Sequence, residues 1–326
     1  MEGSEGYVLN GEQMDDYWLG TRKLEIHFEI VSKCWLNCIH CSSESDIRRD
    51  GHCLSSLKIE NFIASIGSDI ELYVCLTGGE PLLSNQFLPM VRRLRQFSNI
   101  KRIGFFTSGC LGTEVGGINA IDERMSKELK EAGVGFCYVS LYSHLNHVHD
   151  QITTVAGSHK FSLESIRNLL KNGIEAKINL VPMKYNKNEI EKTVYSFNEL
   201  GVPEVRFLRL VRHGRAEKHW KLIGLKREDQ RAMIERAIKS AEEMGLRIRI
   251  TVAGFPEIWN CRPFETGEKC QAGIGLYYID SKGRVFPCAC KKRNQLYFVC
   301  NIDANNIREK LFSPGKVYNV KCLQDG

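Results

Sequence analysis

The chain has 326 residues, of which 43% are hydrophobic and 26% are charged, a composition typical of a globular protein with a sizeable core. Its formal net charge of +6 is spread over the whole length without a long Lys/Arg run, so we expect no nucleic-acid partner. No apolar run approaches the roughly 18 residues that a membrane span needs. The N-terminus, residues 1–17, is polar and acidic, unlike a signal peptide. We therefore expect a cytoplasmic protein with no membrane partner.

Strand and helix patterns alternate along most of the chain. Apolar alternation predicts strands at residues 23–30, 71–76, 103–106, 135–141, 175–181, 204–211 and 246–252. Helical spacing predicts helices at residues 55–66, 87–97, 121–132, 161–172, 187–200 and 227–244, several of which end at a glycine. This alternation is typical of a parallel sheet with helical crossovers. We predict an α/β fold, a partial (β/α)6 TIM-like barrel with its chemistry at the carboxyl ends of the strands.

The pattern changes after residue 252. Strands predicted at residues 275–280 and 284–288 flank a turn, as in a β-hairpin. Six of the 13 cysteines lie from Cys261 onward. We therefore divide the chain into an N-terminal extension at residues 1–22, the barrel at residues 23–252, and a small C-terminal β-hairpin and metal-cluster subdomain at residues 253–326.

Three cysteines, Cys34, Cys38 and Cys41, lie within eight residues directly after the first predicted strand. Disulfides are rare inside cells, so closely spaced cysteines there are buried apolar residues or ligands. Thiolates hold iron–sulfur clusters, and a four-iron cluster bound by three of them keeps one iron open. Zinc is an alternative with His40 as a fourth ligand, although a residue adjacent to Cys41 is poorly placed to reach the same ion. A chance cluster of thiols is the third interpretation.

The C-x3-C-x2-C spacing resembles that of the radical S-adenosylmethionine (SAM) superfamily, and the segment from Thr77 to Pro81 is similar to the family's Gly-Gly-Glu-Pro motif. The resemblance covers roughly residues 23–252. It implies a [4Fe-4S] cluster on Cys34, Cys38 and Cys41, with SAM at the open iron. It also implies reductive cleavage of SAM to a 5′-deoxyadenosyl radical, which abstracts a hydrogen atom from a substrate. Such an enzyme needs an electron donor such as flavodoxin or ferredoxin.

The same resemblance implies which residues contact SAM. The glycine-rich motif would hold the methionine amino group, and serines after the third and fourth strands would contact methionine and ribose. The expected cofactor-binding set is Gly78, Gly79, Glu80, Ser108, Ser140, His40, Asn179 and Arg209. His40 would lie by the adenine, Asn179 would face the nucleoside, and Arg209 would bind a carboxylate of SAM or of the substrate. Ordinary turn hydroxyls and a solvated basic strand end are the alternatives for the serines and for Arg209.

Cys110 follows the third predicted strand closely. A thiol that faces the cavity could donate a hydrogen atom to a substrate radical, so Cys110 is the candidate catalytic residue. A buried, incidental thiol is the alternative.

The segment from Cys270 to Cys288 encloses the predicted hairpin and resembles the opening of a SPASM or shorter twitch extension, which carries auxiliary four-iron clusters. A hairpin between two ligands returns the chain to the same metal. We expect one auxiliary [4Fe-4S] cluster, with Cys261, Cys270, Cys288 and Cys322 as its ligands. Cys290 and Asp325 are alternatives to Cys261, and zinc or free thiols are alternatives to the cluster.

Segments 149–158 and 209–215 resemble parts of radical SAM peptide maturases. This favours a ribosomally made precursor peptide as the substrate, which would undergo crosslinking, oxidation or epimerisation. The N-terminal extension is too short for a folded leader-binding domain, so we expect a separate partner or direct docking. One alternative is a radical SAM cyclase or dehydrogenase that acts on a small molecule in cofactor or antibiotic biosynthesis. An alternative of another class is a non-catalytic iron–sulfur protein for electron transfer or binding.

Overall fold

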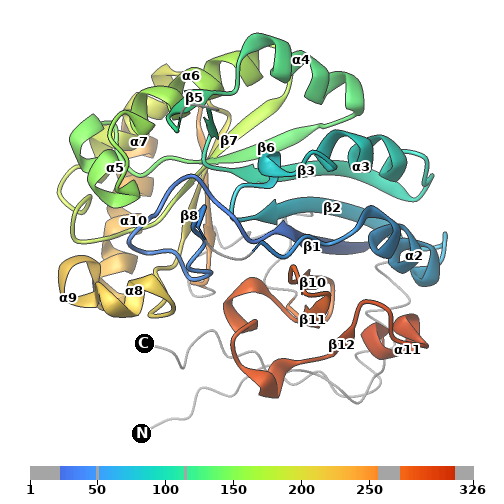
Figure 1. Ribbon diagram of the computed structural model, residues 1–326. Coiled ribbons are helices and arrows are strands. Elements are labelled where there is room, and N and C mark those ends of the chain that lie inside the picture. The colour runs from blue at the N-terminus through green and yellow to red at the C-terminus, as the bar shows by residue number, and fades with distance from the viewer. Residues whose placement is uncertain (1–22, 49–50, 114–115, 256–271, 313–326) are drawn as a thin grey trace, which may run out of the picture.

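The computed structural model describes residues 23–48, 51–113, 116–255 and 272–312. Seven parallel strands in these ranges form the central part of one curved sheet (Figure 1). They follow one another in the order β1 (Lys23–Val31), β2 (Glu71–Gly78), β3 (Ile100–Thr107), β6 (Phe136–Ser140), β7 (Glu175–Leu180), β8 (Glu204–Leu208) and β9 (Arg249–Ala253). The described sheet is open, with β9 at one edge, so the prediction of a partial α/β barrel is confirmed.

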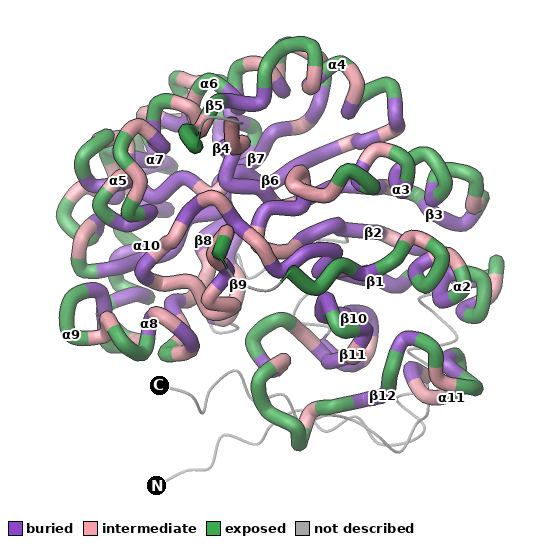
Figure 2. Tube along the Cα trace, in the orientation of Figure 1, coloured by how far each residue is buried: buried purple, intermediate pink, exposed green. Residues whose placement is uncertain are grey.

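Helices that connect the strands pack on the outer face of the sheet (Figure 1). They are α2 (Ser56–Ile66), α3 (Phe87–Leu94), α4 (Glu123–Ala132), α6 (Ser158–Lys171), α7 (Ile190–Glu199) and α10 (Arg227–Glu243). Helix α4 begins where the Asp122 side chain accepts a hydrogen bond from the Met125 amide at 2.7 Å, and it ends at Gly133, whose φ is 107°. Figure 2 shows buried strands and exposed outer faces of the helices, so one core lies between the two layers.

Several short elements lie between the strands and the main helices. They are the 3-10 turn η1 (Pro81–Leu83), strands β4 (Cys110–Gly112) and β5 (Ile118–Ala120), and helices α5 (Asn146–Thr153), α8 (Arg215–Lys218) and α9 (Trp220–Ile223). The sequence did not predict them, and all but α5 span only three or four residues, too few to show a period.

The C-terminal part comprises β10 (Leu276–Ile279), β11 (Arg284–Phe286), β12 (Cys300–Asn301), the 3-10 turns η2 (Ala289–Lys291) and η3 (Gln295–Tyr297), and α11 (Ile307–Phe312). The predicted hairpin is confirmed, because β10 and β11 are antiparallel with Tyr278 opposite Phe286. Strand β10 also pairs in parallel with β1, where Leu276 lies opposite Glu25. The hairpin therefore continues the barrel sheet past its first strand.

Charged side chains fill the barrel interior below the carboxyl ends of the strands. Lys177 and Glu204 are each 1% exposed, and Lys177 Nζ lies 3.7 Å from Glu204 Oε2. Arg206 lies 3.3 Å from Glu204 Oε1 and 4.0 Å above the centroid of the Tyr138 ring. The interior thus has a polar floor whose charges compensate one another. Among the described helices, none combines the length and apolar character needed to cross a lipid bilayer.

Candidate functional site

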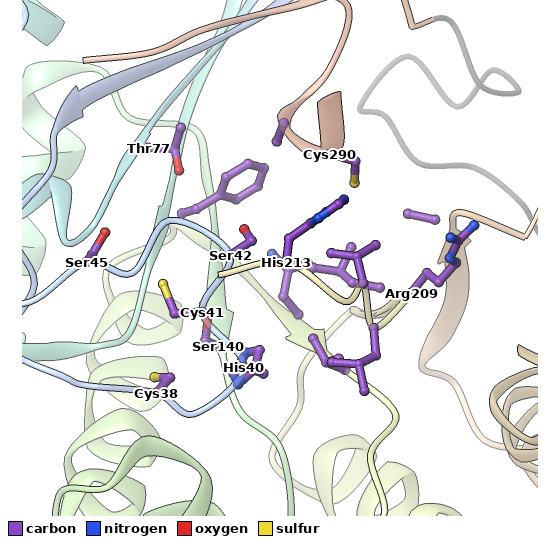
Figure 3. A pocket seen from close by; sticks show the side chains of 18 of the residues that line it. Cys38, His40, Cys41, Ser42, Ser45, Thr77, Ser140, Arg209, His213 and Cys290 are labelled. Atoms are coloured by element: carbon purple, nitrogen blue, oxygen red, sulfur yellow. The ribbon is translucent and has the colours of Figure 1, made fainter. Parts of the chain in front are cut away.

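A cavity of about 420 Å³ lies at the carboxyl ends of the parallel strands. Figure 3 shows Cys38 and Cys41 on one side of it and Cys290, from the C-terminal part, on the other. Cys34 and Cys288 line the same cavity. The structure therefore brings two of the C-terminal cysteines to the same space as the three loop cysteines. Its charged lining residues in the described part of the chain are all cationic, namely Arg206, Arg209, Arg215 and Lys291.

The loop that carries the first three cysteines follows β1 and docks on α5. The amides of Asn37 and Ile39 donate hydrogen bonds to the carbonyl oxygens of Thr153, at 3.3 Å, and Ile152, at 3.0 Å. Within the loop, the Cys41 amide donates to the Cys38 carbonyl at 3.1 Å. The backbone of the loop is therefore held by the fold itself.

Burial governs the protonation of the loop cysteines. It raises the pKa of Cys38 to about 12 and the pKa of Cys34 well above its ordinary value. Both thiols are consequently protonated at neutral pH in the metal-free protein. Because thiolates are the ligands of an iron–sulfur cluster, binding of a cluster here must release these protons.

The glycines of the predicted SAM motif lie against the start of the cysteine loop. A Cβ atom on Gly78 would lie 2.3 Å from the Val31 carbonyl oxygen, and one on Gly79 would lie 2.0 Å from the Lys33 carbonyl oxygen. The Gly79 amide donates to the Val31 carbonyl at 2.8 Å. Both glycines line the cavity. Only glycine allows the end of β2 to approach this closely, which leaves bare backbone facing the cavity.

Glu80 is fully buried and is not part of the described cavity lining. Its carboxylate accepts hydrogen bonds from Thr107 Oγ1 at 2.8 Å, from the Ser108 amide at 2.8 Å and from Ser108 Oγ at 2.7 Å. Burial raises the pKa of Glu80, while these donors favour the ionised form. The side chain therefore braces the end of β2 against the end of β3, and Thr77, Gly78 and Gly79 are the residues of this segment that line the cavity.

Cys110, the candidate hydrogen donor, packs in a small buried cluster with Cys34 and Leu36 of the cysteine loop. It is 0% exposed, and it is absent from the described cavity lining. Its thiol lies 3.5 Å from the Ser158 carbonyl oxygen and 3.6 Å from Ser162 Oγ, on the side of α6. Gly109, with φ of 74°, turns the chain so that Cys110 starts β4 instead of extending toward the cavity. The role of Cys110 as a hydrogen donor stays a prediction, to which the described cavity lining adds no support.

The remaining predicted cofactor residues, Ser108, Ser140, His40, Asn179 and Arg209, all line the cavity. His40 Nδ1 and Asn179 Oδ1 are buried without a hydrogen-bond partner among the described residues. Burial and then Arg215 lower the pKa of His40 to about 4, so its ring is neutral at physiological pH. Two unsatisfied polar atoms on the wall of a cavity are the mark of a site that binds a polar ligand.

Cys288 and Cys290 are the only predicted auxiliary ligands, including alternatives, that fall in the described ranges. Cys261, Cys270, Cys322 and Asp325 lie outside the described residues. The ligand set of the auxiliary cluster therefore stays a prediction.

A buried ion pair, which the sequence did not indicate, joins the C-terminal part to the cysteine loop. Lys292 Nζ donates to Glu29 Oε2 at 2.8 Å, to Ser43 Oγ at 2.6 Å and to the Tyr278 hydroxyl at 3.0 Å. Ser281 Oγ donates to Glu29 Oε1 at 2.9 Å. The partners are separated by up to 263 residues, so no local pattern could have found them.

Across the described ranges, no three His, Cys, Asp or Glu side chains are grouped to hold one metal ion. A four-iron cluster places each thiolate on a different iron, so its three thiols need to line a common cavity without surrounding a common point. Cys34, Cys38 and Cys41 meet that requirement. The bare Gly78–Gly79 backbone and the unsatisfied atoms of His40 and Asn179 suit SAM beside them. The residues present thus fit both groups.

Comparisons with known proteins agree with this site. Residues 28–195 match the model of the radical SAM superfamily. The chain is 25% identical over 309 residues to the AdoMet-dependent heme synthase of Methanosarcina barkeri, covering 88% of this chain and 80% of that protein. It is 31% identical over 172 residues to the GTP 3′,8-cyclase of Thermodesulfovibrio yellowstonii, covering 51% of this chain and 50% of the cyclase. Its fold resembles that of Streptococcus suis SuiB bound to precursor peptide SuiA, with a TM-score of 0.68 at 15% identity, covering 95% and 72% of the two chains.

The fold and the site define an α/β-barrel protein with a cysteine-loop cofactor site. The chain belongs to the radical SAM superfamily. It is therefore an enzyme of the superfamily that uses a [4Fe-4S] cluster and SAM.

Proposed function

We propose that this chain holds a [4Fe-4S] cluster on Cys34, Cys38 and Cys41 and binds SAM beside it to abstract a hydrogen atom from a peptide. The observation that carries the proposal is the shared cavity: the three thiols and the Gly78–Gly79 backbone line one space at the carboxyl ends of the strands. When bound, the cluster and SAM would supply reductive cleavage of SAM to a carbon-centred radical that abstracts a hydrogen atom.

The residues of the chain bind and orient these groups. The backbone carbonyls near Gly78 and Gly79 suit the methionine ammonium group, because no side chain intervenes. The buried polar atoms of His40 and Asn179 suit the nucleoside, since each lacks a partner among the described residues. Arg209 suits a carboxylate. The walls of the barrel keep water away from the reacting centre.

An auxiliary cluster in the C-terminal part is the second element of the proposal. Cys288 lines the same cavity as the cysteine loop, and the Lys292 ion pair holds the neighbouring backbone against that loop. With Cys261, Cys270 and Cys322 as further ligands, a cluster here would border the substrate space. It would bind the substrate or accept an electron from the product radical.

A peptide substrate is supported by the fold. The likeness to SuiB extends over 95% of this chain, and that structure contains a precursor peptide. A cavity that is bordered by both the barrel and the C-terminal part offers room for a peptide segment.

A one-electron donor of the flavodoxin or ferredoxin type would supply the electron that reduces the cluster.

A small-molecule substrate is the second candidate, and one observation favours it. The heme synthase is more similar in sequence than SuiB, over most of both chains. The cavity is lined by cations and by no described carboxylate, which suits a small molecule with several carboxylate groups.

The first experiment tests the radical chemistry. Anaerobically reconstituted protein, reduced with dithionite and given SAM, is expected to release 5′-deoxyadenosine. Cys38→Ala is expected to bind less iron, because only the auxiliary cluster remains, and to release no 5′-deoxyadenosine, whereas Cys53→Ala, which removes an exposed thiol outside the cavity, retains both iron content and product. Iron binding without 5′-deoxyadenosine in the unaltered protein would instead identify a non-catalytic iron–sulfur protein.

The second experiment distinguishes the substrates. Deuterated peptides encoded next to the gene are expected to transfer deuterium into 5′-deoxyadenosine. Transfer from a deuterated iron tetrapyrrole with carboxylate side chains, and none from the peptides, would establish the small-molecule candidate.

A further inference from the structure

Arg215 makes three hydrogen bonds to the backbone of the cysteine loop. Its amide donates to the Cys41 carbonyl at 3.1 Å, its Nε donates to the Cys38 carbonyl at 2.8 Å, and one terminal nitrogen donates to the Ser45 carbonyl at 2.8 Å. One residue thus bonds the backbone at two of the three cysteines and at the end of the loop. Arg215 is the first residue of α8 and lies 177 residues after Cys38.

The residue before Arg215, Gly214, also packs closely against the cysteine loop. Gly214 has φ of 61°, a left-handed conformation that favours glycine. A Cβ atom there would lie 2.6 Å from the Ser42 carbonyl oxygen and 2.7 Å from the Cys41 carbonyl oxygen. Any other residue would push the start of α8 away from the loop. Gly214 and Arg215 therefore form one docking element, with glycine allowing the approach and arginine making the bonds.

The neighbouring arginines lie differently. Arg212 is exposed, and its guanidinium lies 5.9 Å from the centroid of the Trp220 ring. Arg209 lines the cavity farther along, next to Gly254. Arg215 differs because its guanidinium donates hydrogen bonds to two carbonyl oxygens of the cysteine loop, those of Cys38 and Ser45.

A guanidinium at this position also has an electrostatic consequence. When an external low-potential donor passes one electron to the bound cluster, no bond breaks and the cluster gains one negative charge. A fixed positive charge nearby stabilises that added charge and raises the reduction potential. Hydrogen bonding and net charge near the sulfurs are two of the properties by which proteins adjust such potentials.

We propose that Arg215 is a positioning residue that clamps the cysteine loop and favours the reduced cluster through its charge. The electrostatic half rests on the proposed function, since it needs a cluster on Cys34, Cys38 and Cys41. The clamp itself does not, because its contacts are made by the loop backbone without any bound group.

The test compares Arg215→Gln, which removes the charge, with Arg215→Lys, which keeps it but cannot reproduce the fork of donors. Arg212→Gln is the matched control on the same segment. In the metal-free protein, hydrogen exchange of the Ile39 and Cys41 amides is expected to become about tenfold faster in both Arg215 variants. In reconstituted protein, the midpoint potential, followed by electron paramagnetic resonance, is expected to fall in Arg215→Gln and to stay near the starting value in Arg215→Lys. The control is expected to change neither quantity.

Unchanged amide exchange in both Arg215 variants would overturn the clamp. An equal fall of the potential in both variants would overturn the role of the charge. If Arg215→Gln does not fold, Arg215→Lys still decides the clamp, and it decides the charge by whether its potential stays at the starting value. Failure of the unaltered protein to bind a cluster would instead count against the proposed function, while the exchange measurement would still report on the clamp.

Discussion

Glu80 and Ser108 are joined by two hydrogen bonds, because the carboxylate accepts from both the amide and the hydroxyl of this one serine, at 2.8 and 2.7 Å. The pair connects the ends of β2 and β3, with Ser108 on the cavity wall and Glu80 behind it. The glycine backbone before Glu80 is thereby presented to the cavity in one orientation. The carboxylate of the predicted SAM motif thus holds the motif against the next strand.

Replacement of the Glu80 carboxylate tests whether its hydrogen bonds to Ser108 hold the ends of β2 and β3 together. We expect Glu80→Gln to lower the free energy of unfolding by about 1–3 kcal/mol, since the amide group confronts the Thr107 and Ser108 donors with an NH2 group. Urea denaturation measures the loss, and SAM titration of the reconstituted protein should show weaker binding. Glu60→Gln is the control, because Glu60 forms only a surface pair with Arg93. Equal stability of the two variants would mean that Glu80 does not brace the site.

The close packing of Gly79 against the start of the cysteine loop gives a second prediction. A methyl group on residue 79 would meet the Lys33 carbonyl at 2.0 Å, so Gly79→Ala must displace the start of the cysteine loop. We expect a loss of about 1–3 kcal/mol in unfolding free energy and a lower iron content after reconstitution. In the control Gly135→Ala, the added Cβ atom would lie 3.7 Å from its nearest neighbour, the Ile103 carbonyl oxygen, so this variant should retain iron. Full iron loading of Gly79→Ala would contradict the packing argument.

The buried charges of Lys177, Glu204 and Arg206 predict that the stability of the protein depends on pH. Burial alone would raise the pKa of Glu204, but Arg206, Lys177 and Arg249 outweigh it and lower this pKa to about 2. The folded pKa lies below the ordinary value, so the stabilisation is complete above about pH 4.5 and is lost as the pH falls toward 2. Glu204→Gln should therefore cost about 3–5 kcal/mol at pH 7, because the buried cations lose this carboxylate.

Urea unfolding at a series of pH values checks this expectation. The stability difference between unaltered protein and Glu204→Gln should shrink below pH 4.5. A difference that stays constant down to pH 2.5 would show that Glu204 does not titrate as the geometry requires. Glu128→Gln, at a surface pair with Arg124, should show little difference at any pH.

The Lys292 ion pair predicts that the C-terminal part is held by electrostatics. In Lys292→Met, Glu29 would be left buried without its cation, which should cost about 3 kcal/mol and loosen the segment after Cys288. Limited proteolysis at residues 289–298 should become faster. Lys58→Met removes an exposed partner of Asp303 and should change the stability by less than about 1 kcal/mol. Unaltered proteolysis of Lys292→Met would show that the apolar packing of β10 and β11 suffices.

Local patterns in the sequence predicted the alternating strands and helices, the hairpin at residues 275–288, and the cysteine loop with its glycine motif. These features depend on residues close together in the chain, where apolar period, turn chemistry and ligand spacing act directly. The short elements at the carboxyl ends of the strands escaped prediction because α8 and β4 span too few residues to show a period.

The orientation of individual side chains was decided only by the tertiary structure. Sequence spacing placed Cys110 near the end of a strand, but only the structure shows that its thiol is buried against Ser158 and Ser162 and does not belong to the described cavity lining. The bonds from Arg215 to Cys38 and from Lys292 to Glu29 join segments 177 and 263 residues apart. The sequence by itself determined the alternation of strands and helices and the grouping of Cys34, Cys38 and Cys41 in one loop, because both depend on residues close together in the chain. Which groups brace the site was decided by the packing of distant segments, which has no local signature.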